Sequence, residues 1–278
     1  MLFYKIMERV KNAYYPVLLI ITFMMALLVL PVMLLLLFPD AEGNLLYLRM
    51  MASYPVTLAI LSQTMRKMRG ERISELTGKI EPRLFIIITI FIFAISSLRS
   101  IIDGKVQPSG ENAANILISL IISLLFIPAQ CLIEELIFRI IPQKIALRNS
   151  FNSTTLEKVA VTAISSAVFS FLHLGNSEAL LMGSHWASFI YFFLSGAFLF
   201  TLTFIEKGYT SAIAYHTANN LFIAVVINIK DAATIPSYPF FFSERNLAPA
   251  ETITSLVLTM LMVSAIVMAY KKRQLRRA

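Results

Sequence analysis

The sequence has few charged residues and a single cysteine. Only 14% of its 278 residues are charged and 58% are hydrophobic, whereas roughly one-quarter of a soluble domain is charged. This composition excludes an ordinary soluble protein and predicts an all-α, polytopic membrane helical bundle. The single cysteine, Cys131, excludes an intrachain disulfide. The net charge of +8 favours anchoring at membrane surfaces over nucleic-acid binding, because the basic residues lie between apolar segments.

Two common protease signatures are also missing. The sequence contains no His-Glu-x-x-His motif, which would be the usual sign of a zinc peptidase. No serine has the flanking glycines of a nucleophile elbow.

Long apolar runs are abundant and predict about eight transmembrane helices. The runs cover residues 13–38, 45–65, 84–98, 116–133, 159–174, 186–205, 209–229 and 252–270. The first run is too long for the apolar core of a signal peptide, so we expect it to be retained. With the N-terminus inside, eighteen Lys and Arg residues fall on the inner side and four on the outer side. This bias predicts a single membrane domain over residues 1–278 with both termini cytoplasmic.

An acidic pair and an arginine follow the apolar run 116–133. A charge at the centre of a membrane span costs ~3 kcal/mol or more, so it is usually kept for function. Glu135 and Arg139 are four residues apart, on one helical face, where they can pair. Glu134 points about 100° away from that pair and is the candidate general base. The alternative is a solvated charge cluster at the headgroup level.

Polar residues also occur inside two later runs. Phe169 and His173 are four residues apart, and so are His216 and Asn220, so each pair shares a helical face. His216 and Asn220 can both address one oxygen atom, as in an oxyanion site. The alternative for these side chains is hydrogen bonding between helices. Asn219 points elsewhere and is interpreted as a structural amide.

The combination Glu-Glu-x-x-x-Arg, Phe-x-x-x-His and His-x-x-x-Asn, in this order, resembles a known family. It is similar to the CAAX protease and bacteriocin-processing (CPBP or Abi) family of type II CAAX prenyl endopeptidase-like enzymes. The resemblance covers residues 116–229, which we expect to form the catalytic core. It implies an intramembrane endopeptidase that hydrolyses a peptide bond in a membrane-associated peptide or protein.

The resemblance also implies roles for individual residues. Four are expected to be catalytic: Glu134, His173, His216 and Asn220. Three are expected to support the site: Glu135, Arg139 and Phe169. In this scheme Glu134 activates a water molecule that His173 holds, while His216 and Asn220 stabilise the oxyanion.

A metal ion is the open question of this scheme. Glu134, His173 and His216 form a two-histidine, one-carboxylate set that suits zinc with a fourth position for water. The same residues can also work without a metal, and the sequence analysis slightly favours that hypothesis. The cofactor prediction is therefore none, with zinc as the alternative.

Substrate and location follow from the same resemblance. Many relatives are bacterial, so we expect a multi-pass protein of a bacterial cell membrane. Its expected partners are lipid and a membrane-associated peptide or protein, with no nucleic acid. The alternative function is a non-proteolytic bacteriocin-immunity or scaffold protein that retains the fold. Because Glu134 ends an inward-running apolar run, the site is expected to open toward the cytoplasmic leaflet.

Overall fold

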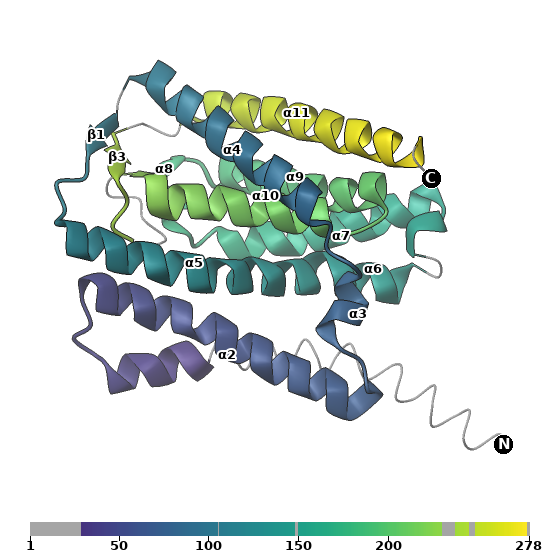
Figure 1. Cartoon of the computed structure of the whole chain (residues 1–278), viewed down its shortest axis with the longest axis horizontal. Helices are drawn as coiled ribbons and strands as arrows, with labels where there is room; N and C mark the ends of the chain where they lie inside the picture. Colours follow the sequence, from purple (N-terminus) through teal and green to yellow (C-terminus); the bar gives the residue numbers. More distant parts are fainter. Residues whose placement is uncertain (1–28, 105, 148–149, 230–236, 245–247, 277–278) are drawn as a thin grey trace.

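The computed structural model describes residues 29–104, 106–147, 150–229, 237–244 and 248–276. Helices dominate this part of the chain and lie side by side along one long direction (Figure 1). The long helices are α2 (Gly43–Arg69), α4 (Pro82–Asp103), α5 (Ala113–Glu135), α7 (Thr155–His173), α9 (His185–Glu206), α10 (Thr210–Leu221) and α11 (Pro249–Leu275). The short helices are α3 (Ile73–Thr77), α6 (Ile141–Ala146) and α8 (Ser177–Leu181).

The predicted all-α membrane fold is confirmed. Within the described residues, six stretches are long and apolar enough to cross a membrane: Gly43–Met68, Pro82–Asp103, Ala113–Ala146, Thr155–His173, His185–Glu206 and Pro249–Leu275. The chain is therefore a multi-pass integral membrane protein. The predicted run 13–38 lies mostly outside the described residues, and the run 209–229 divides into α10, a π-helical turn (Phe222–Val226) and a short strand. The count of eight spans and the cytoplasmic termini stay predictions.

In the described part of the chain, three short strands that the sequence analysis did not predict lie at one end of the bundle. They are β1 (Val106–Pro108), β2 (Ile227–Ile229) and β3 (Phe241–Ser243), in the order β1-β3-β2. β3 runs antiparallel to β1 and parallel to β2. Helix α8 lies at the same end (Figure 1). We call this end, with α8 and the three strands, the sheet end.

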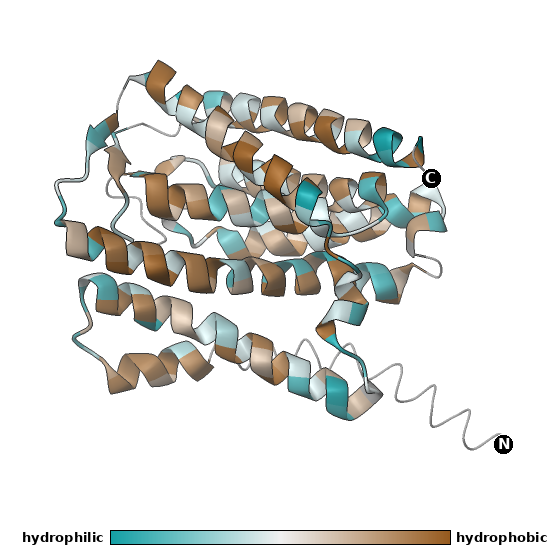
Figure 2. Ribbon diagram, in the orientation of Figure 1, coloured by the Kyte–Doolittle hydropathy of each residue, from teal (hydrophilic) through white to brown (hydrophobic). Residues whose placement is uncertain are grey.

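The opposite end carries most of the positive charge. It holds α3, α6 and the last turns of α11 (Figure 1), and we call it the basic end. The ends of α2 and α11 there are hydrophilic in Figure 2. Its described basic residues are Arg66, Lys67, Arg72, Lys79, Arg83, Lys144, Lys158, Lys207, Lys271, Lys272, Arg273 and Arg276. Described acidic residues at the sheet end are Asp40, Glu42, Asp103, Glu111, Glu244 and Glu251.

Helix starts are fixed by polar residues. The sequence predicts a capping box at Thr154 and Glu157, and the structure confirms it. The hydroxyl of Thr154 accepts from the backbone N–H of Glu157 at 3.3 Å, while the carboxylate of Glu157 accepts from the backbone N–H of Thr154 at 2.9 Å. Asn112 similarly accepts from the backbone N–H of Asn115, at 2.8 Å, where α5 begins. These bonds satisfy backbone donors that the first helical turn leaves free.

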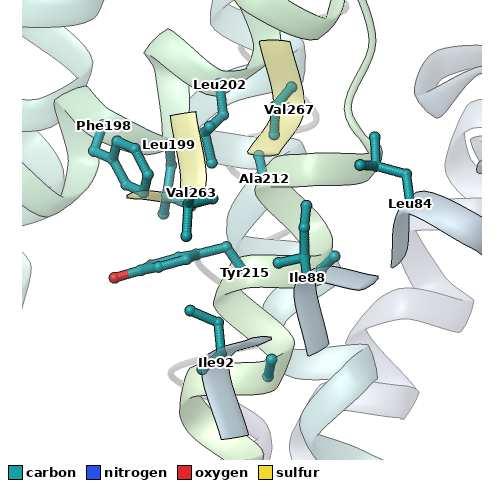
Figure 3. Packing of buried hydrophobic residues seen from close by; sticks show 12 residues of the cluster. Leu84, Ile88, Ile92, Phe198, Leu199, Leu202, Ala212, Tyr215, Val263 and Val267 are labelled. Atoms are coloured by element: carbon teal, nitrogen blue, oxygen red, sulfur yellow. The ribbon is translucent and has the colours of Figure 1, made fainter. Parts of the chain in front are cut away.

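Helix α10 lies at the centre of the bundle. Every residue from 210 to 218 is buried, so this helix has no solvent- or lipid-facing side there. Apolar residues of α4, α9 and α11 pack around it, including Ile88, Leu202 and Val263 (Figure 3). On the far side of α9, Gly196 allows α7 to approach closely, since a Cβ atom there would lie 3.2 Å from the Cα of Ser166. This packing fixes the helix that carries His216.

Candidate active site

The acidic pair ends α5, and the helix changes its winding immediately afterwards. Residues Leu136–Ile140 form a π-helical turn before α6 begins. Such turns are rare and occur frequently at functional sites. Within it, a guanidinium nitrogen of Arg139 lies 3.2 Å from Oε1 of Glu135, and both side chains are about fully buried, at 1% and 2% exposure. The predicted pairing of Glu135 with Arg139 is present.

Phe169 lies between the arginine and a histidine. The guanidinium carbon of Arg139 is 4.3 Å from the ring centroid of Phe169, within the range of a cation–π contact. The ring of Phe169 is also 4.0 Å from that of His173, centroid to centroid. Phe169 therefore contacts both the buried ion pair and the imidazole. These contacts agree with its predicted supporting role.

His216 makes a contact that the sequence analysis did not foresee. Its Nδ1 lies 2.8 Å from Oε1 of Glu135, the same oxygen that faces Arg139. A carboxylate paired with arginine accepts hydrogen bonds, so Nδ1 of the imidazole donates here. The ring is thereby fixed with Nε2 turned toward Glu134.

A second buried carboxylate holds the start of the helix that carries His216. Glu206 accepts from the backbone N–H groups of Thr210 and Ser211, at 3.2 and 2.6 Å, and from the Ser211 hydroxyl at 2.6 Å. Negative charge at a helix N-terminus is stabilised by the free N–H groups there. Glu206 thus anchors α10 one and a half turns before the histidine.

Two imidazole nitrogens lie close to the carboxylate of Glu134. Its Oε2 lies 3.6 Å from Nε2 of His216 and 3.9 Å from Nε2 of His173. Nδ1 of His173 is 2.7 Å from the carbonyl oxygen of Phe169, which can only accept, so Nδ1 donates. In both neutral imidazoles Nε2 is then an acceptor. Oε2 of Glu134 is buried with no hydrogen-bond partner among the described residues. This point therefore suits a small molecule that donates hydrogen bonds.

A cavity of about 210 Å³ adjoins this point. All four predicted catalytic residues line it: Glu134, His173, His216 and Asn220. Polar residues that were not predicted as site residues also line it, among them Gln130, Asn176, Tyr191 and Asn219. Nε2 of Gln130 donates to Oε1 of Glu134 at 3.2 Å, and its spacing of four residues from Glu134 was the signal that could have revealed it.

The structure corrects the prediction about the direction of Asn219, one of two adjacent asparagines in α10. Asn219 was expected to point away from the site, but it lines the cavity and its Nδ2 lies 3.5 Å from Oδ1 of Asn220. Nδ2 of Asn220 is 3.6 Å from the sulfur of Cys131.

The distances around Glu134 bear on whether a metal ion could bind there. A tetrahedral zinc ion bound at about 2.0–2.1 Å would hold its donor atoms roughly 3.4 Å apart. Glu134 and the two imidazoles are farther apart, at 3.6 and 3.9 Å. Among the residues that the structure describes, no group of three or more His, Cys, Asp or Glu side chains is placed to hold a metal. As they stand, these side chains do not fit one.

Comparison with protein-family models gives a match to the type II CAAX prenyl endopeptidase Rce1-like family over residues 112–222. The matched segment begins at the N-cap of α5 and ends just after α10. It contains all seven residues that the sequence analysis assigned to the site. Comparisons with curated proteins and with solved structures found no match.

Proposed function

Residues 112–222 of this chain match the type II CAAX prenyl endopeptidase Rce1-like family model, and from this premise we propose a specific reaction. The family indicates a CAAX-type intramembrane endopeptidase. We propose that the protein hydrolyses a peptide bond of a membrane-associated peptide with a water molecule activated by Glu134. The observation that carries the proposal is the convergence of the Glu134 carboxylate with Nε2 of His173 and of His216 at one cavity.

The first chemical step is the attack of water. The water donates one hydrogen bond to Oε2 of Glu134 and another to Nε2 of His173, which orients a lone pair of its oxygen toward the substrate. Glu134 removes a proton as the oxygen bonds to the carbonyl carbon, and the carbonyl electron pair moves onto the substrate oxygen. General base catalysis of this kind needs the carboxylate within hydrogen-bond reach of the water.

The tetrahedral intermediate then carries a negative oxygen. Asn220 and His216 lie one turn apart on α10 and both line the cavity. The Asn220 amide donates to the oxyanion, and so does Nε2 of His216 when its ring holds a second proton. Glu135, bonded to Nδ1, then balances the charge of that ring. As the C–N bond breaks, Glu134 returns its proton to the leaving amine.

The reaction can be tested in cells by comparing peptides released in wild type and in a Glu134→Ala variant. We expect at least one membrane-associated peptide to be processed in wild type and to accumulate uncleaved in the variant. The variant should be expressed at a similar level, because Glu134 makes one side-chain hydrogen bond, with Gln130. If deletion of the protein changes a phenotype that Glu134→Ala leaves intact, the non-proteolytic scaffold alternative is favoured.

Metal removal provides an independent test. We expect the purified enzyme to keep its activity after treatment with EDTA or 1,10-phenanthroline, because Glu134 and the two histidines do not stand at metal-ligand spacing. The measurement is peptide hydrolysis before and after dialysis against chelator. Loss of activity that added Zn²⁺ restores would show that the side chains close around a metal in the working enzyme.

A further inference from the structure

Two residues in the wall of the catalytic cavity have no part in the proposed chemistry, yet each carries a buried polar atom. These atoms are Oε1 of Gln130 in α5 and Oγ1 of Thr252 in the first turn of α11. Neither atom has a hydrogen-bond partner among the described residues. Buried polar atoms without a partner cost free energy and are few in native proteins. Each is therefore a candidate contact for a molecule that enters the cavity.

The direction of the Gln130 amide follows from its neighbour. Its Nε2 donates to Oε1 of Glu134 at 3.2 Å. An ionised carboxylate can only accept, so the NH₂ group of the amide must face Glu134. The carbonyl oxygen of the same amide is then the atom that is left without a partner. Gln130 thus presents a fixed acceptor beside the carboxylate that activates water in the proposed reaction.

The hydroxyl of Thr252 behaves differently from the hydroxyls of four other helical threonines. Those four donate to the backbone carbonyl four residues earlier, at 2.7–2.9 Å, and belong to Thr57, Thr64, Thr201 and Thr259. Such a bond back to the helix is the usual way in which a threonine satisfies its hydroxyl. Thr252 makes no bond of this kind, although it is only 7% exposed. It also lies outside the segment 112–222, so the family match does not account for it.

A peptide main chain carries the groups that these two atoms lack. Each of its residues brings one N–H donor and one C=O acceptor, and both lose their bound water when the peptide enters a cavity. Most of the cavity wall is apolar, with Phe192, Leu199 and Leu256 among its residues, and cannot replace that water. We propose that Gln130 and Thr252 bind the main chain of the substrate. Oε1 of Gln130 accepts from a backbone N–H, and the Thr252 hydroxyl donates to a backbone carbonyl.

The position of Gln130 indicates which N–H it contacts. In the proposed reaction Glu134 returns its proton to the leaving amine, and Gln130 is bonded to the other oxygen of that carboxylate. Successive residues of an extended peptide are about 3.3–3.6 Å apart. The bonded N–H therefore belongs to the leaving-group side of the scissile bond, close to the bond itself. The inference rests on the proposed function, because it assigns contacts to the same substrate.

Thr252→Val tests the hydroxyl, because valine has nearly the same shape and lacks the oxygen atom. The assay is hydrolysis of the peptide that accumulates uncleaved in the Glu134→Ala cells. We expect kcat/KM to fall about 3–10-fold through a rise in KM, as for the loss of one neutral hydrogen bond in binding. The thermal unfolding midpoint should not fall, since the hydroxyl has no partner in the described part of the chain.

Two further variants separate the hydroxyl from other effects of the change. Thr252→Ser keeps the oxygen atom and should restore the wild-type KM. Thr254→Val makes the same chemical change at an exposed position of α11 that faces another groove, and it should also keep the wild-type KM. An unchanged KM in Thr252→Val would overturn the role of Thr252. So would an equal rise in KM in all three variants.

Gln130 is tested by changing the substrate together with the protein. In a set of analogues, each main-chain amide other than the scissile one is replaced in turn by an ester, which removes a single N–H. One ester on the leaving-group side should lower kcat/KM about 3–10-fold in wild type. The same ester should have little effect in Gln130→Met, which has no amide oxygen. If every ester lowered kcat/KM by the same factor in both proteins, Gln130 would not bind the main chain.

The outcomes distinguish this inference from the proposed function. Hydrolysis that Glu134→Gln leaves intact would refute the proposed function. Hydrolysis that Glu134→Gln abolishes, together with a Thr252→Val variant of unchanged KM and ester effects that do not depend on Gln130, would refute the inference alone.

Discussion

Replacement of Glu134 by glutamine should reduce peptide hydrolysis by about 10²–10⁴-fold, the usual range for loss of a general base. Glutamine has nearly the same shape and can still interact with Gln130, but it cannot take a proton from water. The loss should appear in kcat, with KM nearly unchanged, because the substrate still binds the same cavity. The measurement is the steady-state hydrolysis of a peptide identified by the cellular comparison.

A matched control separates this effect from a general loss of negative charge. Glu42→Gln makes the same chemical change at an exposed position of the sheet end, where the side chain makes no capping bond. We expect Glu42→Gln to keep wild-type kinetics and both variants to show the same thermal unfolding midpoint. If Glu134→Gln retained more than about one-tenth of the wild-type kcat, Glu134 would not be the base.

The local part of this site could be predicted because helix geometry fixes it. The pairing of Glu135 with Arg139 and the shared face of His216 and Asn220 follow from a spacing of four residues. The assignment of the free carboxylate to Glu134 follows from the same spacing. These inferences needed no knowledge of how one helix lies against another.

The contacts between helices could not be predicted in this way. The bond from His216 to Glu135 depends on how far α10 slides along α5, and that register is set by packing around α10 and by the Glu206 anchor. The strands were missed because each has three residues, too few for an alternating pattern to be recognised.

Glu135 provides the sharpest test of how the ion pair and the site depend on each other. Glu135→Ala should destabilise the protein by about 3–5 kcal/mol, because it leaves the guanidinium of Arg139 buried without its carboxylate. It should also reduce hydrolysis, because Nδ1 of His216 loses its acceptor. The first effect is measured as a fall in the thermal unfolding midpoint in detergent. The second is measured as kcat at a temperature below that midpoint.

A double variant separates the two roles. Replacing both partners with apolar residues, Glu135→Leu with Arg139→Met, should recover much of the stability, since a buried ion pair can often be exchanged for well-packed apolar side chains. It should not recover hydrolysis, because His216 would still lack the acceptor that fixes its ring. If the double variant regained both stability and activity, Glu135 would serve only to neutralise Arg139. If it regained stability alone, Glu135 would be the positioning residue for the imidazole.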